Sequence, residues 1–378
     1  MNDVCIISAQ RTPIGRFLGS LARESAVDLA CHAGESTLGE LDRAKIDQVI
    51  IGNILSAGQG MNIGRQIGVR LGLPISTPAF TVNMMCASGM QAIALATHAI
   101  RAGDANAVLC GGTESMSNAP HLMPRSRSGI KLGDGKLVDS ILRDGLVDSF
   151  DHTHMAQTAE TLAVKCGISR EEQDAFAASS QHRYQTAREA GVFADEIAPH
   201  EKLTADEHPR ADSTAESLAD LTPAFDLEGT VTAGNASGIN DGAAMLLLAS
   251  RETAEANDWP IMAVIGETAT VGCDPKEMGL GPVFAVRKIG LPLDGFDAIE
   301  INEAFAAQVL ACLKVMELGA DRINVNGGAI AMGHPVGASG ARLVAHLAGR
   351  IQRGEIETGL ATLCVGGGMG SAITLKKV

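Results

Sequence analysis

Short apolar segments alternate with longer segments of helical periodicity along the chain. Residues 4–9, 49–55, 80–82 and 107–112 form nearly continuous apolar runs of strand length. Such strands are typical of a sheet that helices cover on both faces. The alternation therefore predicts an α/β protein.

The second half of the chain repeats this order of elements. Residues 261–271, 298–301, 323–325 and 360–365 are predicted to be strands, and helical segments separate them. A last strand is predicted at 371–377, after the turn GGGMG.

The two halves also match in their letters. Within 82–112, VN leads through Ser88 into a helix and on to LCGG; within 325–367, VN leads through Ser339 into a helix and on to LCVGG. We infer an internal repeat of a βαβαβαββ unit. The first copy lacks a fifth strand directly after LCGG, and the matching apolar run lies at 243–250.

This duplication divides the chain into three predicted parts. Residues 1–117 with 241–260 form the first half, residues 261–378 form the second half, and residues 118–240 form an inserted loop domain. Long insertions of this kind are often functional.

The reactive residues are predicted to converge at one edge of the scaffold. Cys86 follows the third strand of the first copy, and His334 has the matching place in the second copy. Asn302 follows the second strand of the second copy, and Cys364 lies in its fourth strand. Ligands of parallel α/β sheets bind beyond the carboxyl ends of the strands, so a pseudo-twofold axis would gather these side chains.

Cys86 lies in VNMMCASGM, between a strand and a helix that opens near Ser88. A helix N-terminus stabilises a thiolate, so we expect a lowered pKa and a nucleophilic role. An ordinary buried cysteine is the alternative.

His334 and Cys364 both lie in glycine-rich turns, NGGAIAMGHPVGASG and CVGGGMG. His334 is a candidate base for a thiol or donor to a carbonyl oxygen, and a structural histidine is the alternative. Cys364 is a candidate acid or base, and a buried strand cysteine is the alternative.

Asn302 opens a predicted helix, NEAFAAQVLACLKVMEL. It is either the N-cap of that helix or an amide that holds a water or a carbonyl in the site. His152 and His154 lack further residues at metal-ligand spacing, so no metal is expected.

Charge and composition exclude other classes of function. The formal net charge of −14 disfavours nonspecific binding of nucleic acid or of an anionic membrane. No apolar run has the length of a membrane span. The eight cysteines are scattered without a C-x-x-C pair, which is typical neither of a disulfide framework nor of a zinc site. We expect a cytoplasmic location.

Together, these motifs resemble those of the thiolases over nearly the whole chain. The matching segments, in order, are SAQRTPIGRFLGSL, VNMMCASGMQA, GGTESMSNAP, VTAGNASGINDGAA, NEAFAAQ, NVNGGAIAMGHPVGASGAR and CVGGGMG. The resemblance implies the thiolase fold, in which two duplicated halves form α-β-α-β-α layers. It also implies transfer of an acyl group between coenzyme A thioesters, with no other cofactor.

The resemblance also implies a role for each reactive residue. Cys86 would be the acylated nucleophile, His334 its activating base and Cys364 the acid or base for the second acyl-CoA. Asn302 would position a water in one oxyanion hole. The N–H groups of Cys86 and Gly366 would form the other.

Further residues would bind coenzyme A and the acyl group. Ser237 would contact the pantetheine, Met155 and Phe305 would shape the acyl pocket, and Arg210 would face the nucleotide. The insertion would cover coenzyme A, and SRSGIKLGDGKLVDS within it resembles the oligomerisation loop of short-chain, tetrameric thiolases. A homotetramer and acetoacetyl-CoA are therefore expected.

The residues themselves leave three alternative functions open. The chain would otherwise be a 3-ketoacyl-CoA thiolase of longer chains, a ketoacyl synthase-like enzyme, or a non-catalytic acyl-CoA carrier with the same fold. Cys364 distinguishes a thiolase from the synthases, which use a cysteine with other partners.

Overall fold

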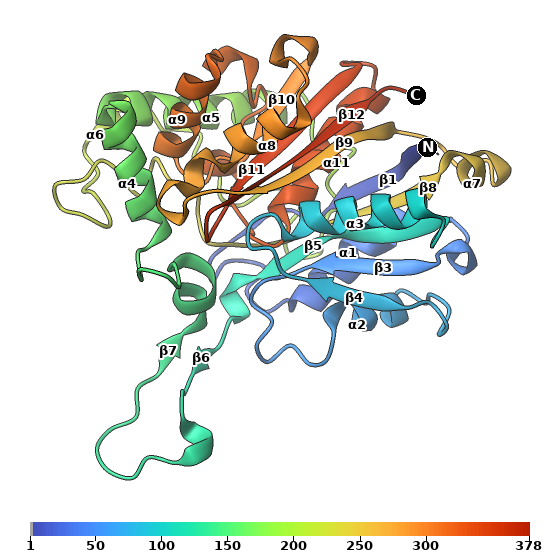
Figure 1. Ribbon diagram of the computed structural model, residues 1–378, viewed down its shortest axis with the longest axis horizontal. Helices are drawn as coiled ribbons and strands as arrows, with labels where there is room; N and C mark the ends of the chain where they lie inside the picture. Colours follow the sequence, from blue (N-terminus) through green and yellow to red (C-terminus); the bar gives the residue numbers. More distant parts are fainter. Residues whose placement is uncertain (1–2) are drawn as a thin grey trace.

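The computed structural model describes residues 3–378, and one large mixed sheet runs through it (Figure 1). Its strands follow the order β10-β11-β12-β9-β1-β8-β5-β3-β4, and the short β2 pairs with β8. The bounds of these strands are β1 (Val4–Arg11), β2 (Gly15–Arg16), β3 (Gln48–Gly52), β4 (Ala79–Val82), β5 (Ala107–Ser115), β8 (Asn240–Ser250), β9 (Ala263–Gly272), β10 (Ala298–Ile301), β11 (Thr358–Val365) and β12 (Met369–Lys376).

Helices alternate with the strands, as the periodicity predicts. No helix within residues 3–378 has the length and apolar character that crossing a membrane requires. The α-helices are α1 (Ala26–Leu38), α2 (Ile63–Arg70), α3 (Ser88–Ala102), α4 (Met155–Cys166), α5 (Arg170–Glu189), α6 (Ala215–Ala219), α7 (Arg251–Ala256), α8 (Gly281–Ile289), α9 (Ala306–Met316), α10 (Ala329–Met332) and α11 (Ser339–Gln352).

Both halves of the chain contribute strands to the sheet, and the four strands of the second half follow the same order as their counterparts β3-β5-β8-β1 in the first. Strands β4-β3-β5-β8-β1 come from the first half and β10-β11-β12-β9 from the second. This order confirms the predicted repeat, and the run 243–250 belongs to β8, the fifth strand of the first copy. Antiparallel pairing of β1 with β9, from Val4 opposite Ile265 to Ile6 opposite Ala263, joins the halves.

Successive side chains of a strand point to opposite faces of the sheet, and each face packs against a different layer of helices. On β1, Ile6 packs in a core between the halves that also contains residues of α3 and α11. Its neighbour Ile7 packs in an outer core with α1 and α2. In the second half, Ile301 of β10 packs in another outer core with α8 and α9. The layers therefore run α-β-α-β-α, as the resemblance implies.

The prediction of a strand at 323–325 is wrong. Only Ile323 pairs with the sheet, as a single parallel bridge to Ile299. Asn324 has a left-handed φ of 45°, which an extended strand does not allow. Its side chain takes over the pairing, because Oδ1 accepts from the N–H of Ile301 at 2.9 Å and Nδ2 donates to the carbonyl of Ile301 at 2.8 Å.

The helix predicted to open at Asn302 begins four residues later, so of the two alternatives for Asn302 the N-cap does not hold. Helix α9 begins at Ala306, and Phe305 is its N-cap, with an extended φ of −146°. The N–H of Asn302 donates to the carbonyl of Thr362 at 3.0 Å, which continues the pairing of β10 with β11. The strand ladder thus holds Asn302 outside the helix.

The segment between β5 and β8 has two distinct parts. An arm that carries β6 (His121–Leu122) and β7 (Val138–Asp139) projects away from the rest of the molecule (Figure 1). Helix α4 packs instead against the second half of the chain, where its apolar residues share a core with α9.

Helices α3 and α11 meet at their N-terminal turns through two glycines. A Cβ on Gly89 would lie 2.9 Å from the carbonyl oxygen of Gly337, and a Cβ on Gly340 would lie 2.7 Å from the Cβ of Met90. Larger side chains would force the two helices apart. Cys86 and His334 stand just before these helices, so the glycine contact brings them together.

We expect Gly340→Ala to lower both stability and activity. Alanine favours a helix intrinsically, but here its methyl overpacks a buried contact, at a cost of about 1–3 kcal/mol. The melting temperature at a fixed heating rate checks this. The control is Gly295→Ala, whose Cβ would meet only the Cγ of Pro292 at 3.8 Å. An equal melting temperature for both variants would contradict the argument.

Candidate active site

A cavity of about 240 Å³ is lined by residues of both halves and of the segment between β5 and β8. Seven of the nine predicted site residues line this cavity: Cys86, Met155, Ser237, Phe305, His334, Cys364 and Gly366. Asn302 is fully buried and contacts His334. Arg210 is exposed and does not line the cavity, so the fold gives no support to its predicted role.

Cys86 is held in a strained loop before α3. Met85 has a left-handed φ of 46°, which is unusual for a residue with a side chain. The hydroxyl of Ser88 stabilises this loop, because it accepts from the N–H of Met84 at 2.8 Å and donates to the carbonyl of Met85 at 2.7 Å. The loop aims the partly buried Cys86 into the cavity.

The predicted lowering of the Cys86 pKa is wrong. Burial raises the pKa of the Cys86 thiol to about 11, because the thiolate loses its hydration. The backbone N–H groups of Gly366 and of Cys86 itself donate to the sulfur and oppose this rise without cancelling it. The resting nucleophile is therefore a neutral thiol at neutral pH.

Cys364 lies near the end of β11 and lines the same cavity as Cys86. Burial raises its pKa well above the ordinary value of a thiol, and the neighbouring Cys86 raises it further. Two thiols that influence each other in this way cannot both ionise readily. Left-handed Gly367 and Gly368 follow and turn the chain tightly into β12.

His334 is bonded on three sides. Its backbone N–H donates to Oδ1 of Asn240 at 2.8 Å, its ring Nδ1 lies 2.6 Å from Oγ of Ser339, and its ring Nε2 lies 3.4 Å from Nδ2 of Asn302. Burial lowers the pKa of His334 to about 4, and the charge of Arg342 adds to this effect. The imidazole is therefore neutral at pH 7 and able to accept a proton.

Asn302 offers an unused acceptor. Among residues 3–378, no side chain or backbone group bonds to its buried Oδ1. A buried amide oxygen of this kind normally has a partner, such as a bound water or a ligand. The position fits the predicted role of holding a water in the site.

Both halves of the chain match family models of the thiolases. Residues 4–252 match the thiolase N-terminal domain, and residues 259–377 match the thiolase C-terminal domain. The chain belongs to the thiolase family. It is 48% identical to an acetyl-CoA acetyltransferase of Pseudomonas aeruginosa, and the match covers 100% of both chains. A probable acetyl-CoA acetyltransferase of Escherichia coli is 47% identical, again over 100% of both.

Solved structures of thiolases are similar throughout. Human mitochondrial 3-ketoacyl-CoA thiolase in complex with CoA gives a TM-score of 0.97 at 43% identity, over 100% of this chain and 98% of that chain. Bacillus anthracis acetyl-CoA acetyltransferase gives 0.96 at 40% identity, over 100% and 99%. These scores establish the thiolase fold.

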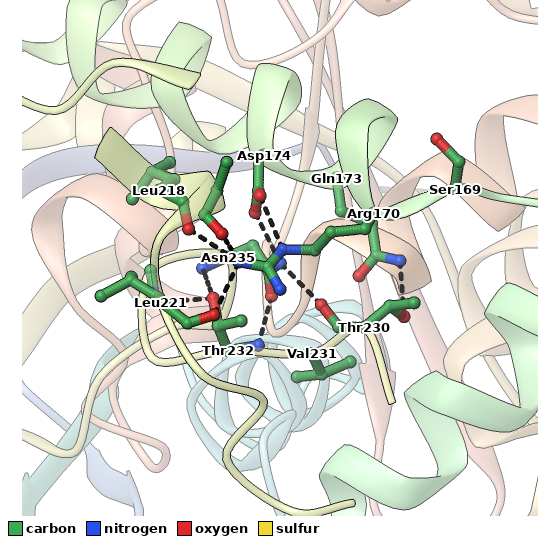
Figure 2. Close-up of polar contacts among 12 residues, drawn as sticks. Ser169, Arg170, Gln173, Asp174, Leu218, Leu221, Thr230, Val231, Thr232 and Asn235 are labelled. Carbon is green, nitrogen blue, oxygen red and sulfur yellow. Dashed lines mark hydrogen bonds and ion pairs between the residues drawn. The ribbon is translucent and has the colours of Figure 1, made fainter. Parts of the chain in front are cut away.

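A polar network fastens the loop that carries Ser237 of this thiolase (Figure 2). Arg170 on α5 donates to the carboxylate of Asp174 at 2.6 Å and to the carbonyls of Leu218 and Leu221 at 2.7 and 2.9 Å. Asp174 in turn accepts from Nδ2 of Asn235 at 2.8 Å. The insertion thus holds the loop two residues before Ser237.

The same loop pairs with the segment between Asn302 and α9. The N–H of Ser237 donates to the carbonyl of Ala304 at 3.0 Å, and Ala236 bridges to Phe305. Ser237 and Phe305 therefore reach the cavity on one small piece of antiparallel structure.

The remaining wall of the cavity is mostly apolar. Met155 opens α4, and Met278 and Phe305 pack beside it and Cys364. His154 caps α4, since its Nδ1 accepts from the N–H of Ala156 at 3.1 Å. Within residues 3–378, no three His, Cys, Asp or Glu side chains gather as metal ligands would.

Two polar residues around His334 were not among the predicted site residues. Asn240 lies on β8 and Ser339 on α11, and both bond to His334. Ser339 was marked in the sequence only as the match of Ser88 in the internal repeat. That match was the available signal, because Ser88 stands beside the nucleophile.

The rate of alkylation of Cys86 by iodoacetamide should rise with pH well above neutrality. A thiol with a pKa of about 11 is mostly protonated at pH 7, and its thiolate population grows tenfold per pH unit until that pKa. Mass spectrometry of the Cys86 peptide from pH 6 to pH 10 measures this, with Cys86→Ser as the blank. A plateau already reached below pH 7 would instead indicate a thiolate–imidazolium pair.

Proposed function

We propose that this thiolase catalyses the reversible conversion of two acyl-CoA thioesters into 3-ketoacyl-CoA and CoA through an acyl group on Cys86. One observation carries the proposal: the thiols of Cys86 and Cys364 share one cavity with the neutral imidazole of His334. Gly366 lines the same cavity, and the side-chain amide of Asn302 contacts the imidazole. This set provides a nucleophile, a proton acceptor, a second acid and donors for an oxyanion.

In thiolysis, the sulfur of Cys86 attacks the 3-keto carbon and its proton passes to His334. The bond between carbons 2 and 3 then breaks, and its electron pair forms the enolate of the departing acyl-CoA. Cys364 protonates carbon 2 of this enolate. The thiol of CoA next passes its proton to the Cys364 thiolate and attacks the carbonyl of the thioester. The bond to Cys86 breaks, its sulfur recovers the proton held by His334, and the ping-pong cycle is complete.

Two groups of donors support the developing negative charges. The N–H groups of Gly366 and Cys86 already point at the Cys86 sulfur, so they are close to the oxygen of a thioester formed there. Asn302, with His334, would hold a water against the oxygen of the second thioester. Burial strengthens each of these bonds, because little water competes inside the cavity.

We propose acetoacetyl-CoA or another short 3-ketoacyl-CoA as the substrate. The cavity of about 240 Å³ is smaller than typical ligand pockets, which measure about 300–1,000 Å³. Met155 and Met278 belong to its apolar lining. The names of the similar bacterial proteins agree with this choice.

Coenzyme A is the partner that this reaction requires, and a similar human thiolase binds it in a solved structure. We further propose a cytoplasmic homotetramer. Bacterial relatives support the location, and the exposed arm with β6 and β7 offers a surface for the contact. The apolar side chain of Leu132 on this arm is 96% exposed and would be covered by contact with another subunit.

A ketoacyl synthase-like function and a carrier function fit the cavity less well. Cys364 supplies a second thiol that a synthase does not need, and it faces the same cavity as Cys86. A carrier would require neither a strained nucleophile loop nor a buried neutral imidazole, whose arrangement costs stability.

Replacing Cys86 and replacing Cys364 should each stop turnover, but at different steps. Cys86→Ser should form no acetyl-enzyme from acetyl-CoA, because the hydroxyl is a far weaker nucleophile at neutral pH. Cys364→Ala should still form acetyl-enzyme but lose condensation by about 10²–10⁴-fold, the usual contribution of a general acid or base.

Mass spectrometry detects the acetyl-enzyme, and consumption of acetoacetyl-CoA with CoA measures turnover. Cys110→Ala is the matched control, because that thiol is buried in the central core away from the cavity lining. Full thiolysis by Cys364→Ala would overturn its assigned role. Binding of CoA without any thiolysis by the native protein would favour a carrier.

The side chain of Met155 should limit the acyl chain length of the substrate. We expect kcat/KM for 3-ketohexanoyl-CoA and longer substrates to fall about tenfold or more below that for acetoacetyl-CoA, since the cavity is small and Met155 lines it. Met155→Ala should recover part of this loss for the six-carbon substrate. Met123→Ala on the exposed arm is the control. Equal kcat/KM across the series in the native enzyme would contradict the short-chain proposal.

A further inference from the structure

Ser339 stands on the first turn of α11 and touches the imidazole of His334. Its Oγ lies 2.6 Å from Nδ1 of His334 and donates to the carbonyl of Pro335 at 3.0 Å. Ser339 is only 2% exposed, so these are the contacts that its hydroxyl makes. The direction of the short bond decides which nitrogen of the imidazole carries a proton.

The hydroxyl has a single hydrogen, so only two arrangements exist. If that hydrogen goes to Pro335, the bond to His334 requires a hydrogen on Nδ1, and Nε2 keeps a lone pair. If it goes to His334, Nδ1 is the acceptor and the proton of the neutral ring is on Nε2. Only the first arrangement leaves Nε2 able to accept a proton from a thiol.

The matching serine of the first copy shows which arrangement this loop favours. Ser88 begins α3 as Ser339 begins α11. Its Oγ accepts from the N–H of Met84 and donates to the carbonyl of Met85, and neither direction is ambiguous, because an N–H only donates and a carbonyl only accepts. In both copies, a serine donates to a loop carbonyl and has one lone pair left for a donor.

We propose that Ser339 is a positioning residue that holds His334 as the Nδ1–H tautomer, so that the lone pair of Nε2 takes the proton of Cys86. In the first copy the N–H of Met84 donates to the hydroxyl of Ser88. At Ser339 the Nδ1–H of the imidazole takes the place of that donor. The contact of 3.4 Å between Nε2 and Nδ2 of Asn302 agrees, since an amide N–H donates to a lone pair. This inference rests on the proposed function of Cys86.

The charged groups near the imidazole do not decide its tautomer, so the hydrogen bonds do. Arg342 of α11 is the charged group whose effect reaches His334, and both thiols of the cavity are neutral at pH 7 because burial raises their pKa values. The ring itself is neutral, with a pKa of about 4. A neutral ring has one proton to place, and Ser339 is the group that places it.

Nitrogen-15 NMR of protein labelled in histidine measures the tautomer directly at pH 7. The signals of His334 are assigned by their loss in His334→Gln. We expect a protonated Nδ1 and an unprotonated Nε2 in the native protein, and a shift of population toward Nε2–H in Ser339→Ala. A native His334 with its proton on Nε2 would overturn the proposal, whether or not any variant folds.

Kinetics of acetyl-enzyme formation provide the second test. Ser339→Ala should acylate Cys86 about 10- to 100-fold more slowly, as when the supporting partner of a functional histidine is lost, with little change in KM. Ser339→Thr retains the hydroxyl and should restore most of the rate. Thr97→Val is the matched control, because it removes a buried helical hydroxyl that donates to Ile93 at 2.8 Å, away from the imidazole.

The outcomes separate this inference from the proposed function. Native acylation rates in Ser339→Ala, or an equal loss in Thr97→Val, would reject the positioning role. Absence of thiolysis in the native enzyme would reject the proposed function, and the NMR measurement would still decide the tautomer.

Discussion

The contact between α3 and α11 at Gly89 and Gly340 is the constraint on which the site depends. The chain folds the same unit twice, and each copy places one reactive residue in the loop before its central helix. Those loops come within reach of each other only because the helices touch almost backbone to backbone at their first turns. A methyl group on either glycine would meet atoms of the facing segment at less than 3 Å.

Burial then determines the chemistry of the cavity. The same loss of water raises the pKa of Cys86 and lowers that of His334, so both groups rest uncharged. A site of this kind stores no ion pair, and charge develops in it only while substrate reacts. The donors of Gly366 and Asn302 are in place before that moment, which is the condition for stabilising a transient oxyanion.

A buried ionic cluster ties the insertion to both halves. Arg11 on β1 donates to Glu196 at 2.7 Å and to Asp206 at 2.7 and 3.0 Å, and Glu196 also bonds His346 of α11 at 2.7 Å. Burial alone would raise the pKa of Glu196, but His346 and Arg11 hold it at about 2. Losing one partner of such a cluster leaves a buried charge unpaired, so the three parts of the chain depend on one another.

The sequence by itself determined the α/β class, the internal repeat and the residues that converge, because apolar periodicity and matched motifs are local properties. It placed Cys86 and His334 at matching points of the two copies and Cys364 in a strand of the second, and the strand order of the sheet follows that repeat. Only the tertiary structure decided that Asn302 continues a strand pairing rather than capping a helix, and that Asn324 ends the predicted strand at 323–325.

Tertiary structure also decided the protonation of the site. A helix N-terminus near Cys86 is visible in the letters and predicts a lowered pKa, whereas the burial that outweighs it depends on segments more than two hundred residues away. The contact of Ser339 with His334 was likewise hidden, since they lie five positions apart across a loop whose path no periodicity describes. Local pattern specifies which residues are present, and long-range packing sets their pKa values and their partners.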